Sequence, residues 1–465
     1  MSQSVTIELV SPAPAFSGNA CTLVGEHGPA LEAAHEPFFR RTSRPPAEGG
    51  IEEPDDTAGT EVTQRWNQSW THIARVFSTF WCFFLIGAND AAYGALLPSL
   101  ESYYGLDFVV ISLVFLSPFA GYVVSAMSNN VLHQKIGQRG IAMVSAACHM
   151  AAYIIMAAHP PYVVLVIAFI IAGFGNGVGD SAWNAWIGSL ANSNELLGFM
   201  HACYGVGGTL SPLVATLIVE KYHLGWYTFY YFMIGAAAIE LVSLTWSFWS
   251  ATGKAYRQKH RIAETGQKAG LVEALWHSSG ARVSWICAIF LLAYIGVEVS
   301  LGGWIVTFMI QVRQGGEFAS GMTATGFWLG ITLGRIILGF VTPRVGVNLA
   351  IAVYLALTIG LEFLFWFVPQ FYVSAVAVAL QGFFLGPLFP GVVVVASKLL
   401  PKHLHVTVIG FASAFGGCGA ALLPFAVGVL AQAAGVMVLQ PIILALLVVM
   451  LGLWLFLPKV DNKRD

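Results

Sequence analysis

The stretch FSTFWCFFLIGANDAAYGALLP, residues 77–98, holds one charged side chain, Asp90, in a run that is otherwise almost entirely apolar. A helix needs about 20 mostly apolar residues to cross the hydrocarbon core of a bilayer, so this stretch predicts a membrane-spanning helix. A charged side chain at that depth costs at least about 2.5–3.5 kcal/mol on insertion scales, and it persists where it faces protein, water or a partner. The stretch therefore predicts a class of fold and a candidate functional residue together.

The composition of the whole chain agrees with a membrane protein. Of the 465 residues, 57% are hydrophobic and 10% are charged, and the mean hydropathy is +0.72, whereas soluble domains carry about 25% charged residues. We expect an all-α membrane protein with about twelve transmembrane helices in two pseudo-symmetric six-helix bundles. The expected spans lie near 73–98, 109–131, 141–158, 162–189, 197–219, 227–249, 283–310, 321–342, 347–367, 371–397, 405–431 and 436–457.

Polar segments separate the predicted parts of the chain. Residues 1–66 are rich in Pro, Gly, Ala and Glu and lack helical periodicity, which predicts a disordered tail. Six lysines and arginines lie in 250–282, a linker between bundles at 73–249 and 283–458, and a short tail follows at 459–465. Lysine and arginine gather on the side of the tails and linker, so the positive-inside rule places both termini in the cytoplasm. We expect a multi-pass protein of the plasma membrane.

The two halves carry related sequence. The turn HQKIGQRG follows the second predicted span, and TPRVG follows the eighth. A shared spacing and order of this kind indicates a duplicated bundle, as in transporters whose halves are parallel repeats. An offset of 209 residues relates Lys135 to Arg344, Gly137 to Gly346, Gly173 to Gly382 and Gly177 to Gly386.

This organisation resembles the major facilitator superfamily over residues 73–458. Within it, GANDAAYGALLPSLESYYGL, GFGNGVGDSAWNAWIG and NELLGFMHACYGVGGTLSP resemble the fucose:proton symporter group and its fungal relatives, which include the bypass-of-stop-codon transporter-like proteins. The resemblance implies a secondary transporter, with Asp90 and Asp180 at the positions of the group's proton-coupling acids. The family's acidic residue in the basic turn is absent, because Gln134 and Pro343 take its place.

Asp90 is the first candidate for chemistry in the first half. It is either a proton-titrating carboxylate of a cavity or a hydrogen-bonded residue that holds helices together. Asp180 forms one polar stripe with amides four residues before and after it, and this stripe lines a cavity or joins helices. The candidates for solute binding in this half are Asn89, Tyr93, Asn176, Asn184, His201 and Tyr204.

Glu298 holds nearly the place in the second half that Asp90 holds in the first, so it is a third candidate for proton coupling; it is either a titratable or solute-binding group or part of a structural pair. Arg335 lies deep in a predicted span, where it either pairs with Glu298 or extends toward the membrane surface near Arg344. Tryptophans here either stack on a sugar or anchor the protein at the interface. The candidates for solute binding in this half are Tyr294, Trp304, Trp328 and Gln381, and the candidates for gating in the whole chain are Lys135, Arg139, Arg335 and Arg344.

Several functional classes lack a basis in the sequence. The chain has no phosphate-binding loop, no HExxH motif and no ordered serine, histidine and acid, so we expect no enzyme activity, no cofactor and no metal site. A formal charge of −2 provides no field for nucleic acid. The expected partners are a small polar solute such as a sugar, protons and the lipid bilayer, and the protein is expected to be monomeric. Export of a metabolite or toxicant, and a non-transporting nutrient receptor, are the alternatives.

Overall fold

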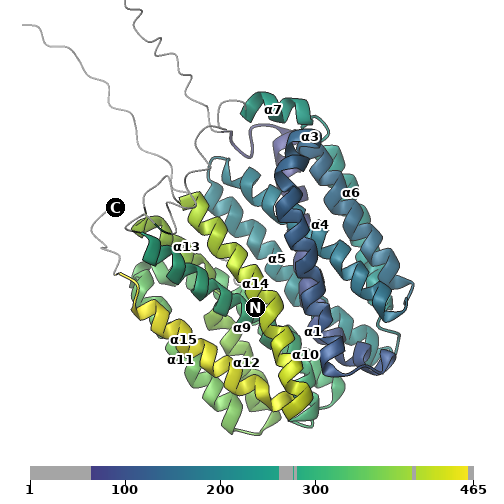
Figure 1. Cartoon of the computed structure of the whole chain (residues 1–465), viewed down its shortest axis with the longest axis vertical. Coiled ribbons are helices and arrows are strands. Elements are labelled where there is room, and N and C mark those ends of the chain that lie inside the picture. The colour runs from purple at the N-terminus through teal and green to yellow at the C-terminus, as the bar shows by residue number, and fades with distance from the viewer. Residues whose placement is uncertain (1–63, 261–275, 277–279, 401–404, 459–465) are drawn as a thin grey trace, which may run out of the picture. The chain divides into compact units, whose positions relative to one another are not determined.

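The computed structural model describes residues 64–260, 276, 280–400 and 405–458, and every regular element in these ranges is a helix (Figure 1). The predicted tails, except residues 64–66, and most of the predicted linker beyond 260 lie outside the described residues. The first half contains α1 (Trp70–Tyr104), α2 (Phe108–Ile111), α3 (Leu113–Ala157), α4 (Tyr162–Gly188), α5 (Ser193–Thr216), η1 (Leu217–Lys221) and α6 (Thr228–Ser247). After α7 (Gly253–His260) come α9 (Ala281–Gln311), α10 (Glu317–Val345), α11 (Val347–Phe367), α12 (Phe371–Leu385), α13 (Leu388–Leu399), α14 (His405–Ala434), η4 (Val436–Val438) and α15 (Leu439–Leu455).

The second and third predicted spans both lie in α3, in which two helices meet at a kink at Gly137. Eleven helices in the described ranges are long and apolar enough to span a membrane, and one of them, Phe108–Ala157, has 50 residues. At 1.5 Å per residue it is about 75 Å long, more than twice the thickness of the hydrocarbon core. It therefore crosses twice, and the chain changes direction at Gly137 alone, where φ is 68° and ψ is −174°.

The repeat seen in the sequence has a backbone counterpart. Gly137 and Gly346, which the offset of 209 residues relates, both have positive φ, at 68° and 94°. Side chains other than glycine rarely adopt this region, so each half needs glycine at the equivalent reversal. The offset thus relates two positions with the same backbone requirement.

The helix α7 is fastened to this reversal in the first half (Figure 1). The backbone N–H of Arg139 donates to the carbonyl of Ala251 over 2.9 Å, and the Arg257 guanidinium donates to the carbonyl of Gln134. A side chain on Gly253 would begin 2.4 Å from the Lys135 carbonyl oxygen, so the two backbones touch. The start of the linker is therefore part of the first half.

The two halves meet at the end of the membrane helices opposite α7, which we call the far end; it holds residues 105–107, 312–316 and 435. There the Trp304 ring packs against the rings of Phe108 and Phe115, with centroid distances of 5.6 and 6.1 Å. The N–H of Phe108 donates to Gln432 Oε1 over 2.9 Å.

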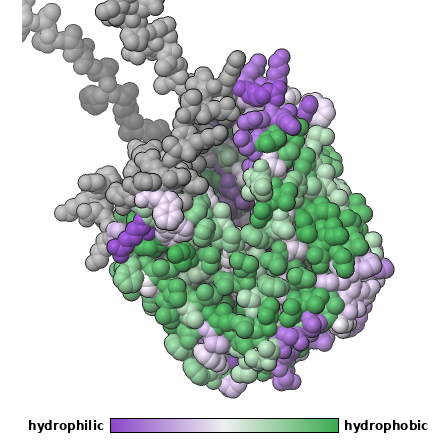
Figure 2. All heavy atoms as spheres, viewed as in Figure 1, coloured by the Kyte–Doolittle hydropathy of each residue, from purple (hydrophilic) through white to green (hydrophobic). Residues whose placement is uncertain are grey.

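Nearer the middle of the helices, the hydroxyls of Thr209 and Thr332 lie 3.2 Å apart and join α5 to α10. Toward the end that carries α7, which we call the linker end, the surface is hollowed beside the hydrophilic residues of α7 (Figure 2). The halves are thus packed together at the far end and part toward the linker end.

Candidate functional site

The carboxylate of Asp90 is the centre of a polar cluster in the first half. Its Oδ1 accepts hydrogen bonds from Asn89 Nδ2 at 3.2 Å and from Asn176 Nδ2 at 3.1 Å, and its Oδ2 accepts from the Tyr204 hydroxyl at 3.1 Å. The Asn89 amide also donates to the Tyr93 hydroxyl over 2.7 Å. Asp90 is half-buried, and the three donors that hold it are neutral groups. Helices α1, α4 and α5 all contribute to this cluster.

The polar stripe of α4 continues from this cluster toward the linker end. The Asn184 amide donates to Asp180 Oδ1 over 3.0 Å, and Asn184 Oδ1 lies 3.2 Å from His201 Nε2. Asn176 is fully buried, whereas Asp180, Asn184 and His201 are half-buried. The predicted stripe therefore exists as a line of polar groups that becomes more exposed along its length.

The second half presents an ion pair. One guanidinium nitrogen of Arg335 lies 3.2 and 3.4 Å from the two carboxylate oxygens of Glu298 and 3.5 Å from the Tyr294 hydroxyl. Of the two positions expected for Arg335, the structure shows the pair with Glu298 and not an extension toward Arg344. Both side chains are mostly buried, with 18% of Arg335 and 7% of Glu298 exposed. The pair lies within electrostatic reach of Tyr204, which donates to Asp90.

The two candidate tryptophans lie in different places. Trp328 packs against Gly208 of α5 and Gly302 of α9, and its indole N–H is buried without a hydrogen-bond partner among the described residues. Trp304 belongs to the far-end contact, and its N–H donates to the Pro424 carbonyl over 2.9 Å. Trp328 thus lies between the halves with a free donor, while the donor of Trp304 is already used.

Gln381 is paired away from the clusters. Its amide donates over 2.6 Å to the carboxylate of Glu362 on α11, and both residues are fully buried.

The remaining gating candidates lie apart from Arg335. Lys135 and Arg139 flank the reversal to which α7 is fastened, and the exposed Arg344 donates to the Phe340 carbonyl of its own helix.

A second buried pair was not identified from the sequence. His149 Nδ1 on α3 and Glu240 Oε2 on α6 are 2.8 Å apart, and neither side chain is exposed. The available signal was a lone histidine in the apolar run AACHMAAY together with an acid in the sixth span, since ionisable residues inside spans are functional candidates. The residues alone do not show that these two meet.

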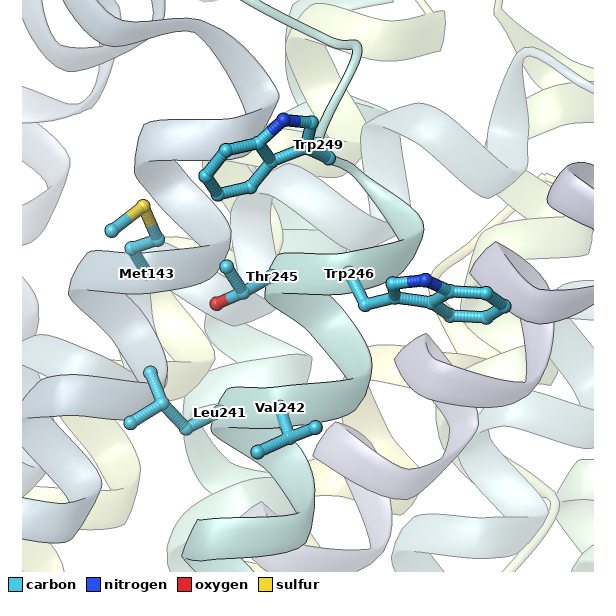
Figure 3. Close-up of a pocket in the computed structure, with 6 residues that line it drawn as sticks. All are labelled: Met143, Leu241, Val242, Thr245, Trp246 and Trp249. Carbon is cyan, nitrogen blue, oxygen red and sulfur yellow. The ribbon is translucent and has the colours of Figure 1, made fainter.

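A shallow apolar groove of about 480 Å³ lies on the outside of the first half (Figure 3). It contains none of the candidate residues. Its tryptophans are 73% and 60% exposed, as expected for aromatic side chains that face lipid at the membrane interface. The residues that line it are Met143, Leu241, Val242, Thr245, Trp246 and Trp249.

Comparisons with known proteins place the chain among transporters. The sequence profile of the Major Facilitator Superfamily matches residues 79–361 and 315–465. Bypass of stop codon protein 6 of Saccharomyces cerevisiae is 31% identical over 414 residues, which cover 82% of each chain. The Glucose/mannose transporter GlcP of Bacillus subtilis is 22% identical over 74% of this chain and 85% of its own. The E. coli fucose:proton symporter superposes with a TM-score of 0.59 at 14% identity, covering 82% of this chain and 98% of that structure.

Proposed function

Because the chain belongs to the major facilitator superfamily, we propose that it is a secondary transporter that carries a sugar or similar small polar solute and couples its movement to protons. The observation that carries the proposal is the half-buried Asp90 carboxylate, which is held by neutral donors from three helices. Relatives that are named for glucose, mannose and fucose support the class of solute.

The packing of the halves supports alternating access. They meet at the far end and part toward the linker end. With the linker in the cytoplasm, as the distribution of lysine and arginine predicts, this is an inward-facing state. Rocking of one half against the other would close the linker end and open the far end around the same central groups.

A proton on Asp90 changes what its neighbours can bind. Ionised Asp90 occupies the hydroxyl of Tyr204 and the amide of Asn176. Once Asp90 is protonated, these donors are less strongly held and can bind sugar hydroxyls. Neutralising the carboxylate also lowers the cost of closing the site away from water. Proton binding thus favours both solute binding and closure.

Other candidates divide by their exposure and by the groups that they already bind. We propose that Asn184 and His201 bind solute hydroxyls, since both are half-buried and their hydrogen bonds are with half-buried residues, and that Trp328 stacks on an apolar sugar face. We leave out Trp304 and Gln381, because Pro424 and Glu362 already use their donors.

The proposal is tested with the full chain in proteoliposomes that contain a pH-sensitive dye. D-glucose, D-mannose and L-fucose are added outside, one at a time. We expect at least one sugar to enter and to acidify the interior, and a protonophore to remove that acidification. Entry of sugar without a change in pH would refute proton coupling, and entry of none of the sugars would refute the solute class. Release of preloaded solute driven by an inward proton gradient would instead identify an exporter.

Gly94 provides a test of the proposed movement. A side chain there would begin 1.9 Å from the carbonyl oxygen of Gly302 on α9, so Gly94→Ala obstructs the contact of the halves at the far end. We expect transport of the sugar found in the screen to fall at least about tenfold, which corresponds to about 1.4 kcal/mol. Gly235→Ala on α6 is the control, because nothing lies within 4 Å of the added methyl group. Wild-type transport by Gly94→Ala would contradict the movement.

A further inference from the structure

The buried pair of His149 and Glu240 is not explained by stability. Replacing a buried ion pair with apolar residues is often neutral or stabilising, because removing two charged groups from water costs about as much as their attraction returns. This pair is fully buried in a membrane-spanning bundle. Ionisable groups in such positions are retained for function by default.

The pair lies directly behind the Asp90 cluster. The Nε2 atom of His149 lies 3.0 Å from where a side chain on Gly175 would begin, and Gly175 precedes Asn176 on α4. The Asn176 amide nitrogen donates to Asp90, while its Oδ1 is buried without a partner among the described residues. His149 Nε2 is also buried without one. One proton on Nε2 would give the histidine a donor directed at this part of α4.

We propose that protonated His149, held by Glu240, is the buried counter-charge of Asp90: acting past Asn176, it favours ionised Asp90 and so sets the pH at which Asp90 takes up a proton. The pair shares one titratable proton, between His149 Nδ1 and the Glu240 carboxylate, in both states of Asp90. That proton is on His149 when Asp90 is ionised, and it moves to Glu240 when Asp90 is protonated. His149 and Glu240 are thus positioning residues. The inference rests on the role of Asp90 in the proposed function.

Other titratable groups around the pair do not replace it in this role. The Tyr153 ring stacks on His149 with a centroid distance of 6.1 Å, and the side chain of Glu240 lies within electrostatic reach of Cys82 on α1. None of these neighbours is a cation, so His149 is the group of this set that can carry positive charge toward Asp90. The titratable groups within reach of the pair are Cys82 and Asp90 on α1 and Tyr153 on α3, and Tyr230 of α6 stacks on Tyr153.

The test needs no solute, so its outcome is independent of the transport assay. The purified full chain is titrated in lipid nanodiscs by infrared difference spectroscopy, which follows the carbonyl stretch of protonated carboxyl groups, and Asp90→Asn assigns the Asp90 band. In His149→Gln we expect the midpoint of this band to move to higher pH by about one unit, because the counter-charge is gone. Glu240→Gln should move it in the same direction, and Glu240→Asp should leave it near the wild-type value.

Glu362→Gln is the matched control, since Glu362 is equally buried but lies in the other half and is bonded to Gln381. Its Asp90 midpoint should equal that of the wild type. An unchanged midpoint in a folded His149→Gln protein would overturn the inference. If the single variants do not fold, the double variant H149Q/E240Q keeps a neutral hydrogen bond and should show the same upward shift.

A second readout is measured on the wild-type protein, so it does not depend on whether a variant folds. A second carboxyl band, from Glu240, must rise together with the Asp90 band on acidification. If only the Asp90 band rises, the proton does not move within the pair and the inference fails. Loss of sugar-driven acidification in Asp90→Asn, together with an unchanged midpoint in His149→Gln, would leave the proposed function intact and refute this inference alone.

Discussion

Replacing Asp90 with asparagine is expected to abolish proton-driven accumulation of solute while leaving solute exchange across the membrane in place. Asparagine keeps an oxygen that can accept from the Asn176 amide, but it cannot take up a proton. A symporter that moves one proton per solute accumulates solute up to about tenfold for each pH unit of gradient, since one unit is worth about 1.36 kcal/mol. In the variant the accumulation ratio should fall to about one.

The measurement is uptake of radiolabelled sugar into proteoliposomes, with and without a pH gradient, beside exchange at equal concentrations on both sides. Asp107→Asn is the matched control. Asp107 caps α2 at the far end by accepting from the Val110 N–H over 2.8 Å, and asparagine caps helices equally well. Accumulation by Asp90→Asn at the wild-type level would exclude Asp90 from proton coupling.

Removing either partner of the Glu298–Arg335 pair is expected to destabilise the protein by about 3 kcal/mol, because the remaining charge is left buried and uncompensated. This value lies in the lower part of the usual range for the stability lost when a buried ion pair is broken, because 18% of the Arg335 side chain is exposed. The double variant E298Q/R335Q should recover most of this loss, as two neutral amides can bond to each other. Denaturant unfolding of the two single variants and the double variant in detergent forms the required cycle.

Additive losses in that cycle would mean that the two residues do not act as a pair. Transport by the double variant then separates two roles. If the pair only holds helices together, transport should return with stability. If Glu298 or Arg335 binds solute or protons, stability returns and transport does not.

The positions of the spans could be predicted from the sequence because crossing a bilayer demands a length and a composition that are visible along the chain. The offset between halves also located the two glycines with positive φ. That the second and third spans meet at the single residue Gly137 could not be predicted, because the polar residues around it resemble a longer turn. Hydropathy detects the polar residues of 132–140 but not the backbone angle of Gly137.

Contacts within the site were less accessible to sequence reasoning. The polar residues near Asp90 were predicted as candidates from their depth and spacing, and the structure brings Asn89, Asn176 and Tyr204 onto that carboxylate. Which donors remain free could not be predicted, because that depends on partners distant in sequence, such as Glu362 for Gln381. His149 was missed for the same reason.

The fastening of α7 to the reversal at Gly137 has a mechanical consequence. The helix is joined to the first half through the backbones of Ala251 and Gly253 and through Arg257. In the proposed rocking movement, α7 would therefore move with that half. Because α7 lies at the linker end (Figure 1), a rotation about the middle of the membrane helices would displace it more than the groups around Asp90. The position of α7 would thus report the angle between the two halves.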